Sequence, residues 1–310
     1  MNRRTFLHNA TFGLPAIFAV MEAVSCSATK SAAGTKNTNI RWSMGWILWR
    51  DFKKKQIPLR EAIDNLSALG LDGIEFSPRK DELQKHDFTR ESFRDFIKDK
   101  NIAVSGNYFG GDYYDPAKKN AIMTSFRSTI DNLKFYGSKN VVIGPPGRNV
   151  EDIKDCVIKS APMLNEMGRI AREEGITIGV HPHVNTIIEA PDEIDLIMEL
   201  TDPQYVGMAP DTGHIRLGGG NVVEIVNKYR DRLCYFHFKD SDGEFKRPDF
   251  APNLRELGKG VIDFPAVMKI LKNVSFKGWL NVEQDYTTTT PLESATVSAG
   301  YIHNVLKKIL

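Results

Sequence analysis

The sequence predicts a single (β/α)8 barrel, in which eight parallel strands close into a ring surrounded by helices. From Ile40 onward, short apolar runs alternate with amphipathic segments of helical period, and eight such runs occur. The chain beyond the first 38 residues is also close to the ~250 residues typical of this barrel. An open doubly wound sheet would instead place a glycine-rich phosphate loop after the first strand. The residues there, Met44 to Trp49, are bulky, so the closed barrel is favoured.

The predicted strands are the apolar runs, each short enough and apolar enough to be buried on both faces. They are Ile40–Leu48, Asp72–Ser77, Ala103–Phe109, Asn140–Gly144, Thr177–His183, Val206–Pro210, Leu233–Phe238 and Gly278–Gln284. Between them lie segments with apolar residues at helical spacing. The clearest are Leu59–Ala68, Ala161–Glu174, Ile194–Leu200, Val222–Tyr229, Pro265–Lys272 and Ala295–Ile309. Glycines are expected to end several helices, at Gly70, Gly137 and Gly175.

The first 26 residues have the features of an export signal. The pair Arg3-Arg4 precedes an apolar stretch from Ala10 to Val24, as in secretory and twin-arginine signals. The run Ala23-Val24-Ser25-Cys26 resembles a lipoprotein cleavage box, which would leave a lipid-bearing Cys26. A plain N-terminal helix or membrane anchor is the alternative. We therefore expect a signal over residues 1–26, a flexible tether over 27–38, and a barrel over 39–310 that is exported, either periplasmic or lipid-anchored at the cell envelope.

Charge and cysteine content argue against a nucleic-acid partner and against a disulfide framework. The chain has 41 basic and 39 acidic residues and no basic stripe with interleaved aromatics, so a nucleic-acid partner is not expected. Beyond Cys26, the two remaining cysteines, Cys156 and Cys234, do not make a disulfide framework, and buried packing is expected for both. The oligomeric state is left open.

Ionisable residues gather at the ends of the predicted strands, where barrel active sites form. Four of the seven histidines follow consecutive strands, and four acidic residues join them. The set is Glu75, His181, His183, Asp211, His214, His237, Glu283 and Asp285. Imidazoles and carboxylates converging from different strands indicate a site for a divalent metal ion such as Mn²⁺, Co²⁺ or Zn²⁺. A hydrogen-bonded core histidine is the alternative for any one of them.

Four further residues are candidates for substrate contacts or proton transfer. Lys239 follows His237 closely and could hold a substrate oxygen or share a proton, or it could belong to an exposed loop. Trp46 at the end of the first strand could form a wall against a sugar ring, or only close the barrel. Asn107 and Arg216 have weaker claims of the same kind.

The C-terminal half resembles the xylose-isomerase-like sugar isomerase/epimerase superfamily and, within it, the inosose (2-keto-myo-inositol) dehydratases. The stretches that carry the resemblance are His181 to Thr186, Glu189 to Asp195, Thr201 to Pro203, Asp211 to His214, Asp231 to Asp240, Glu256 to Phe264 and Gly278 to Asp285. The N-terminal half matches only in element order and in Gly73-Ile74-Glu75.

The resemblance implies a set of metal ligands and a reaction. It implies His181, Asp211, His237 and Glu283 as ligands, with the histidine on strand five in place of the acid of related isomerases, as in the dehydratase branch. The implied chemistry is removal of a proton α to a carbonyl of a keto-sugar or keto-polyol, followed by β-elimination.

Candidate roles follow from this scheme, and two other functions remain open. His183 or His214 would be the base, with Lys239 or the other histidine as the acid, and Asp285 would contact the substrate. A sugar isomerase or epimerase would need paired acids, for which Glu75 and Glu283 are the candidates. A non-catalytic sugar-binding lipoprotein is the third reading.

Overall fold

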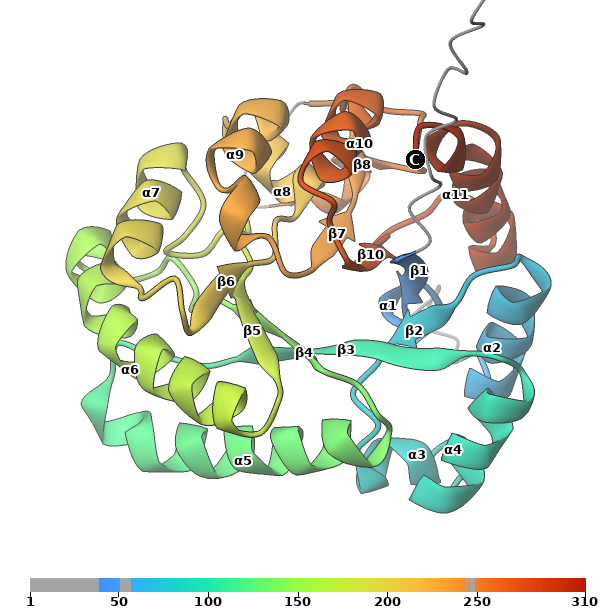
Figure 1. Cartoon of the computed structure of the whole chain (residues 1–310), viewed down its shortest axis with the longest axis horizontal. Helices are drawn as coiled ribbons and strands as arrows, with labels where there is room; N and C mark the ends of the chain where they lie inside the picture. The colour runs from blue at the N-terminus through green and yellow to red at the C-terminus, as the bar shows by residue number, and fades with distance from the viewer. Residues whose placement is uncertain (1–38, 51–56, 244, 246–248) are drawn as a thin grey trace, which may run out of the picture. The chain divides into compact units, whose positions relative to one another are not determined.

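The structure, a computed structural model, describes residues 39–50, 57–243, 245 and 249–310 (Figure 1). The predicted export signal, the tether and Cys26 lie outside the described residues. Within those residues, no helix is both long enough and apolar enough to cross a membrane.

All eight predicted strands form, and they lie parallel in one curled sheet. The strands are β1 (Ile40–Gly45), β2 (Gly73–Glu75), β3 (Ala103–Gly110), β4 (Asn140–Gly144), β5 (Thr177–Val180), β6 (Val206–Met208), β7 (Phe236–Phe238) and β10 (Gly278–Val282). Their order in the sheet is β6-β5-β4-β3-β2-β1-β10-β7. Bridges join Met208 to Leu233 and Asp211 to His237, and they connect the two edges of the sheet. The ring is therefore closed, which confirms the predicted barrel.

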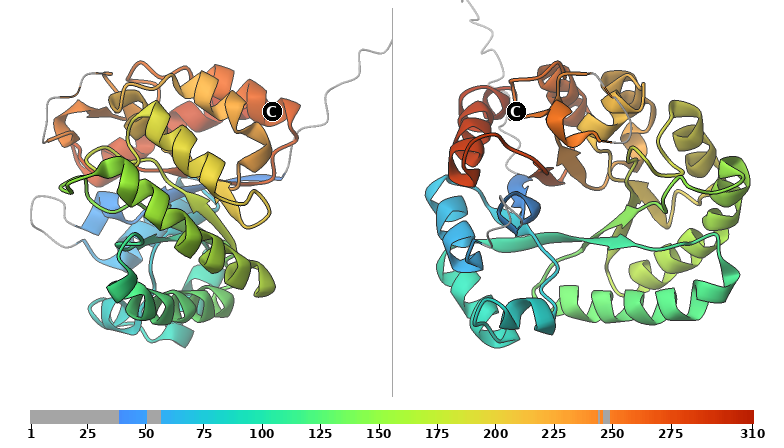
Figure 2. Two further views of the ribbon diagram at one scale, coloured as in Figure 1. Left: turned by 90° about the vertical axis from the view of Figure 1, so that its left-hand side faces the viewer. Right: turned by 180° about the vertical axis from the view of Figure 1, so that it is seen from behind.

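Helices follow the strands, and the longer ones surround the ring (Figures 1 and 2). They are α1 (Ile47–Arg50), α2 (Leu59–Ala68), α3 (Lys80–Gln84), α4 (Arg90–Asp99), α5 (Lys119–Phe135), α6 (Ile153–Glu173), α7 (Pro191–Leu200), α8 (Thr212–Leu217), α9 (Val222–Lys228), α10 (Phe264–Asn273) and α11 (Pro291–Asn304). Short 3-10 turns cover Pro116–Lys118, Arg230–Arg232, Ala251–Asn253 and Leu306–Lys308. A small antiparallel pair, β8 (Asp240–Ser241) with β9 (Leu254–Arg255), stands at the mouth after β7.

Several element boundaries differ from the sequence prediction. The helix predicted from Ala161 begins at Ile153, because the Asp152 side chain caps it by accepting from the Asp155 N–H at 2.9 Å. Pro162 lies inside this helix and has no N–H to donate to the carbonyl of Ile158, a residue on the exposed side of the helix. The strand predicted to reach His183 ends at Val180, so both following histidines lie on a loop.

The core has an outer and an inner layer. The outer layer packs the strands against the helices, and the inner layer fills the ring with Val142, Ala209, Tyr235 and Trp279. Cys234 fits between strands because Gly179 and Gly207 have no side chain there. Cys156 and Cys234 are free thiols, the first buried and the second half-buried. The helix-ending glycines adopt φ between 68° and 71°, the left-handed conformation expected at these positions.

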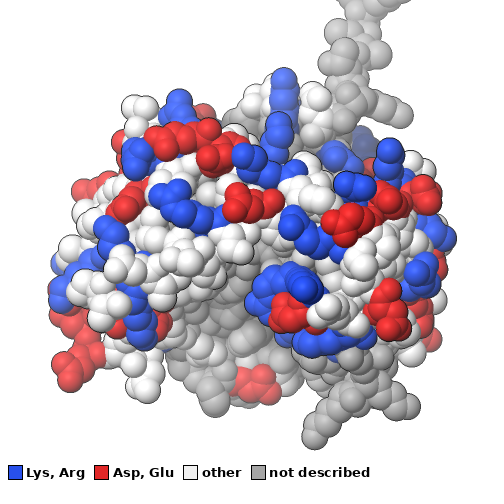
Figure 3. Space-filling model, turned by 90° about the horizontal axis from the view of Figure 1, so that it is seen from below, with Lys and Arg blue, Asp and Glu red and all other residues white. Residues whose placement is uncertain are grey.

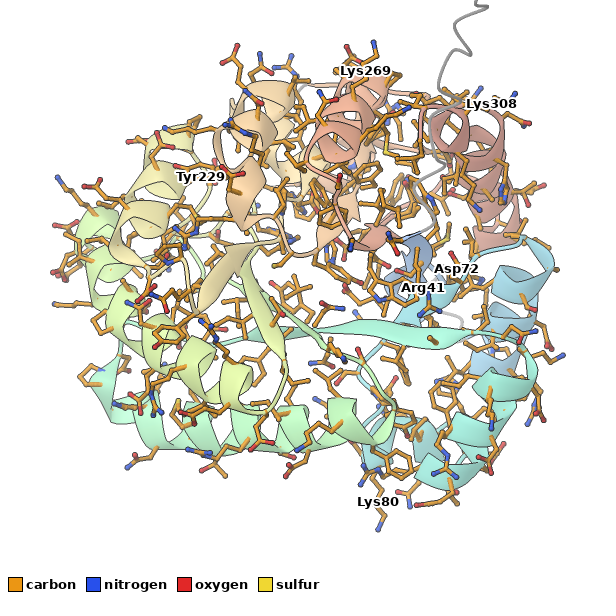
Figure 4. The ribbon with its side chains drawn as sticks, in the orientation of Figure 1. Arg41, Asp72, Lys80, Tyr229, Lys269 and Lys308 are labelled. Carbon is orange, nitrogen blue, oxygen red and sulfur yellow. The ribbon has the colours of Figure 1, made fainter. Side chains whose placement is uncertain are left out.

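A charged and aromatic cluster lies near the amino-terminal ends of β1, β2 and β10. Arg41 and Asp72 lie side by side there (Figure 4), and an Arg41 Nη2 donates to the Asp72 carbonyl at 3.2 Å. The same guanidinium stacks 4.0 Å from the centre of the Trp279 ring. On the face shown in Figure 3, basic and acidic side chains of the described residues are interspersed.

Candidate metal centre and active site

Four side chains converge at the carboxyl ends of strands that are consecutive around the closed ring. His181 follows β5, Asp211 follows β6, His237 lies in β7 and Glu283 follows β10. One nitrogen or oxygen of each lies within 4.8 Å of those of the others. The two histidines and Asp211 are fully buried, and Glu283 is nearly so. The ligand set implied by the sequence resemblance therefore comes together in space.

Local hydrogen bonds point these groups at a common centre. Asp211 caps α8: its Oδ1 accepts from the His214 N–H at 2.8 Å, and its Oδ2 has no hydrogen bond. His237 Nε2 bonds to Glu75 Oε2 at 2.7 Å, which leaves Nδ1 facing Glu283 Oε2 at 2.5 Å and Asp211 Oδ2 at 3.8 Å. The partner of Nδ1 is thus the Glu283 carboxylate, and Asp211 Oδ2 is likewise paired with the Lys239 ammonium.

His181 Nδ1 is buried and has no hydrogen-bond partner among the described residues, and such an atom is costly unless something else satisfies it. Two imidazoles and two carboxylates around one point are a donor set suited to a divalent first-row ion. The residues present therefore fit a metal ion, and Glu75 takes the place of the outer carboxylate that commonly orients a metal-binding histidine.

The charges of the cluster are strongly coupled. Burial raises the pKa of Asp211 to about 7, although the nearby Lys239 ammonium acts to lower it. Burial alone would lower the pKa of His237, but the Glu283 and Glu75 carboxylates outweigh it and raise the pKa well above its usual range. Burial, with His237 next to it, lowers the pKa of His181. His181 is therefore a neutral imidazole, the form that binds metal.

Lys239 lies beneath the cluster, with 1% of its surface exposed. Its Nζ bonds to Asp285 Oδ2 and His214 Nε2, each at 2.8 Å, and lies 3.2 Å from Asp211 Oδ2 and 3.1 Å from Glu283 Oε2. Burial acts to lower the pKa of Lys239, but these carboxylates raise it well above its usual value. Lys239 is thus a buried counter-ion. The interpretation of Lys239 as a residue of an exposed loop, which the sequence left open, is wrong.

A cavity of about 340 Å³ opens over the cluster. Its walls are Gly45, Trp46, Ile47, Arg50, Glu75, Phe76, Ser77, Tyr108, His181, His183, Glu283 and Asp285. This volume lies within the range of small-ligand sites, roughly 300–1,000 Å³. A larger cavity, about 810 Å³, lies between the start of α5 and α6 and contains no residue of the cluster.

The two histidines considered as bases occupy different environments. His183 lines the cavity, and its Nδ1 lies 2.6 Å from the Val184 carbonyl, which fixes the proton on Nδ1 and leaves Nε2 with a lone pair. Burial and the Lys239 charge lower the pKa of His183, so the ring is neutral. His214 is 1% exposed, bonds to Lys239 and is not a wall of the cavity. The two rings stack with centres 3.5 Å apart.

Arg148 and Glu193 hold the loop that carries His183 through a network of hydrogen bonds. The Arg148 guanidinium donates to the Thr186 carbonyl at 3.0 Å and makes a two-point bond to Glu193, at 2.8 and 2.6 Å. Glu193 in turn accepts the backbone N–H groups of Glu189 and Ala190. His183 is therefore held by a charge-assisted network on the outer side of its loop.

The predicted substrate contacts divide into two groups. Trp46 and Asp285 line the cavity as expected. Asn107 is buried and donates to the Tyr108 carbonyl instead of lining the cavity. Arg216 is exposed and lines a separate pocket, because it stands two residues after His214 on a helical turn and points to the other side. Asn107 and Arg216 therefore do not line this cavity, and their contact with a substrate stays a prediction.

Two aromatic residues that contact the candidate site were not predicted from the sequence. Tyr108 lines the cavity with its ring 5.7 Å from that of His181, and burial together with the charge of Glu283 raises its pKa. Phe250 packs against His183 and His214, with ring centres 5.4 and 4.8 Å away. Tyr108 was within reach of sequence reasoning, since it adjoins Asn107 at the end of a predicted strand. Phe250 belongs to no predicted element.

A closed (β/α)8 barrel with a buried His/Asp/His/Glu cluster under a small-molecule cavity defines a class, the barrel enzymes with a candidate divalent-metal centre. Residues 63–302 match the family described as xylose isomerase-like TIM barrel. The chain belongs to this family, which confirms the resemblance seen in its sequence.

Relatives within the family are similar over nearly their full length. The chain is 32% identical to inosose dehydratase of Clostridium beijerinckii over 278 residues, covering 80% of this chain and 90% of the relative. It is 27% identical to inosose dehydratase of Bacillus velezensis over 301 residues, covering 86% and 97%. The crystal structure of the IolI protein with a bound zinc atom has a TM-score of 0.74 and 19% identity, covering 87% of this chain and 99% of that one. The protein is an enzyme, and these relatives support a dehydratase of the superfamily.

Proposed function

We propose that the protein is a metal-dependent lyase that removes water or an alcohol from a keto-sugar or keto-polyol by α-proton abstraction and β-elimination. The observation that carries the proposal is His183: a neutral imidazole with a fixed tautomer stands on the wall of the cavity beside the metal-ligand cluster. The inosose dehydratases among its relatives support the same class of substrate.

The ligand cluster supplies the electrophile. A divalent ion held by His181, Asp211, His237 and Glu283 would polarise the substrate carbonyl and so make the neighbouring C–H group more acidic. The Mn²⁺, Co²⁺ and Zn²⁺ ions all suit this donor set.

His183 takes the proton. Its Nδ1–H is committed to the Val184 carbonyl, so the lone pair of Nε2 is the basic site. The stacked His214 ring and the Phe250 edge fix the plane of the imidazole. A base positioned in this way contributes typically ~10²–10⁴ in rate.

The walls of the cavity suit a polyhydroxylated ring. Trp46, Phe76 and Tyr108 provide aromatic surface, and Asp285 and Glu283 provide acceptors for hydroxyl groups. One keto-sugar or keto-polyol ring is the substrate that we propose for this space.

A sugar isomerase or epimerase is the less favoured alternative. It would need two acids that exchange protons with neighbouring carbons, but Glu75 is engaged by His237 and Glu283 belongs to the ligand cluster. A non-catalytic sugar-binding protein would not need a base of fixed tautomer beside the cluster. We also propose that the enzyme is exported and lipidated at Cys26, which would place it at the cell envelope. Cell fractionation tests the location. Metabolic lipid labelling of the wild type and of a Cys26→Ser variant tests the lipidation.

The activity is tested with purified, metal-loaded protein in D2O. The substrates are 2-keto-myo-inositol and 3-keto-glucosides, and the readouts are elimination product and solvent deuterium in the sugar. We expect about one bound metal per chain, lost in His237→Ala. His183→Ala should keep its metal and lose ~10²–10⁴ of turnover, whereas His303→Ala, remote from the cavity, should match the wild type. Metal-independent sugar binding without exchange or elimination would favour the binding protein, and deuterium exchange without elimination would favour the epimerase.

A further inference from the structure

We infer that Tyr108 is a catalytic residue, the group that donates a proton to the departing hydroxyl of the substrate. The inference rests on the proposed elimination and adds to it a source for the second proton transfer. Loss of hydroxide from carbon is slow unless its oxygen is protonated as the bond breaks, so an elimination site needs an acid as well as a base.

The position of Tyr108 places it in the same cavity as the base. It lies near the end of β3, and its ring meets the His181 ring edge to face, at 87°. His183, Glu283 and Tyr108 are all walls of this one cavity. Tyr108 is 44% exposed although it packs against a buried ligand, because its open side is the cavity itself.

The Tyr108 hydroxyl is available for a substrate. Among the described residues, none makes a hydrogen bond with it, whereas the buried hydroxyls of Tyr113 and Tyr235 are both paired. The hydroxyl lies against the backbone of Gly144 at the end of β4, where a methyl group would overlap it. Gly144 has an ordinary backbone conformation, so its missing side chain serves this close approach and not a special turn.

Other protic groups near the cavity are less suited to this step. Lys239 is buried, is not a cavity wall, and already directs its protons to His214 and to three carboxylates. His214 is buried beside it. Asp285 is the acceptor of the Lys239 ammonium. Among the described walls, Tyr108 combines an O–H donor that no other residue engages with access to the cavity.

His183 and Tyr108 together account for both protons of the elimination. His183 Nε2 takes the proton of the substrate C–H bond, whose electron pair is first held as the enolate of the substrate. That pair then forms the new C=C bond as the neighbouring C–O bond breaks. The oxygen leaves with the electron pair of that bond and takes the Tyr108 Oη proton, so that one water molecule is released. The phenolate then regains a proton from solvent, and the imidazolium loses one.

The test compares leaving groups in Tyr108→Phe, which keeps the ring and removes only the hydroxyl. With hydroxide as the leaving group, we expect turnover to fall about 10²–10⁴-fold while solvent deuterium still enters the α position. With a β-fluoro analogue of the same keto-sugar, turnover should stay within about tenfold of the wild type, because fluoride leaves without a proton. Tyr114→Phe, in the separate cavity beside α6, should behave as the wild type with both substrates.

A second variant guards against a misfolded Tyr108→Phe. Gly144→Ala keeps the phenol but displaces it, and we expect the same loss with the hydroxyl substrate and the same recovery with the fluoro analogue. Equal turnover of wild type and Tyr108→Phe would overturn the inference, as would an equal loss with both leaving groups, which would make Tyr108 a binding wall. If the wild type eliminates neither group, the proposed lyase function itself fails.

Discussion

The hydrogen bond between Glu75 and His237 gives a prediction that separates two roles for Glu75. The carboxylate is 2.7 Å from His237 Nε2, its side chain is 8% exposed, and the bond leaves Nδ1 directed at the ligand cluster. If Glu75 only orients and polarises His237, its removal should weaken metal binding. If it is a proton shuttle, as the isomerase reading requires, its removal should abolish turnover and leave metal binding intact.

The magnitude follows from the geometry. A buried hydrogen bond to a charged group is worth about 1.5–3 kcal/mol. At 1.36 kcal/mol for each factor of ten, this corresponds to about 10- to 150-fold in metal affinity. Glu75→Gln keeps a carbonyl acceptor for the His237 N–H and should fall at the lower end, whereas Glu75→Leu loses the acceptor and should fall at the upper end.

The assay is competition for Zn²⁺ or Mn²⁺ with a chromophoric chelator, using metal-free protein at pH 7.5. Glu174→Gln is the matched control, because this carboxylate is exposed and pairs with Lys134 away from the barrel mouth. An unchanged metal affinity in both Glu75 variants, together with lost turnover, would refute the orienting role and return Glu75 to the catalytic set.

Three further predictions concern charge and burial. Lys239→Met should lower the free energy of unfolding of the metal-free protein by about 3–5 kcal/mol, because three carboxylates lose their buried counter-ion. Urea titration checks this, and Lys228→Met, an exposed ion pair, should cost under about 1 kcal/mol. Metal affinity should rise at least about tenfold per pH unit from pH 6 to 7, and it should be lost as the pH falls. The raised pKa values keep Asp211 and His237 protonated in acid, so the metal ion must displace those protons to bind. A flat affinity between pH 6 and 8, measured by the same chelator competition, would contradict it. Asp240→Ala should lower the free energy of unfolding, measured by urea titration, by roughly 2–4 kcal/mol. The reason is that the Asp240 carboxylate accepts backbone N–H groups of the loop 258–262, which would otherwise be unpaired. A loss below about 1 kcal/mol would show that water replaces the carboxylate.

The sequence could not place two of the predicted contact residues, because the direction of a side chain depends on local backbone conformation. Arg216 and His214 both follow β6, and both were candidates for the site. The helix α8 places them on different sides, so His214 is buried beside Lys239 and Arg216 is exposed. Asn107 and Tyr108 are likewise neighbours on β3, and it is Tyr108 that reaches the cavity.

The sequence by itself determined the barrel and the candidate ligand set. Strand and helix periodicity are local patterns, and parallel strands must bring their carboxyl ends to one rim, so residues there can be grouped without knowing distances. Only the tertiary structure decided what each group does within the rim. Glu75 and His237 are 162 residues apart, and no periodicity pairs them. The burial of Lys239, the fixed tautomer of His183 and the open hydroxyl of Tyr108 likewise depend on which side chains surround them, because hydrogen bonds and desolvation act over a few ångströms in space and not along the chain.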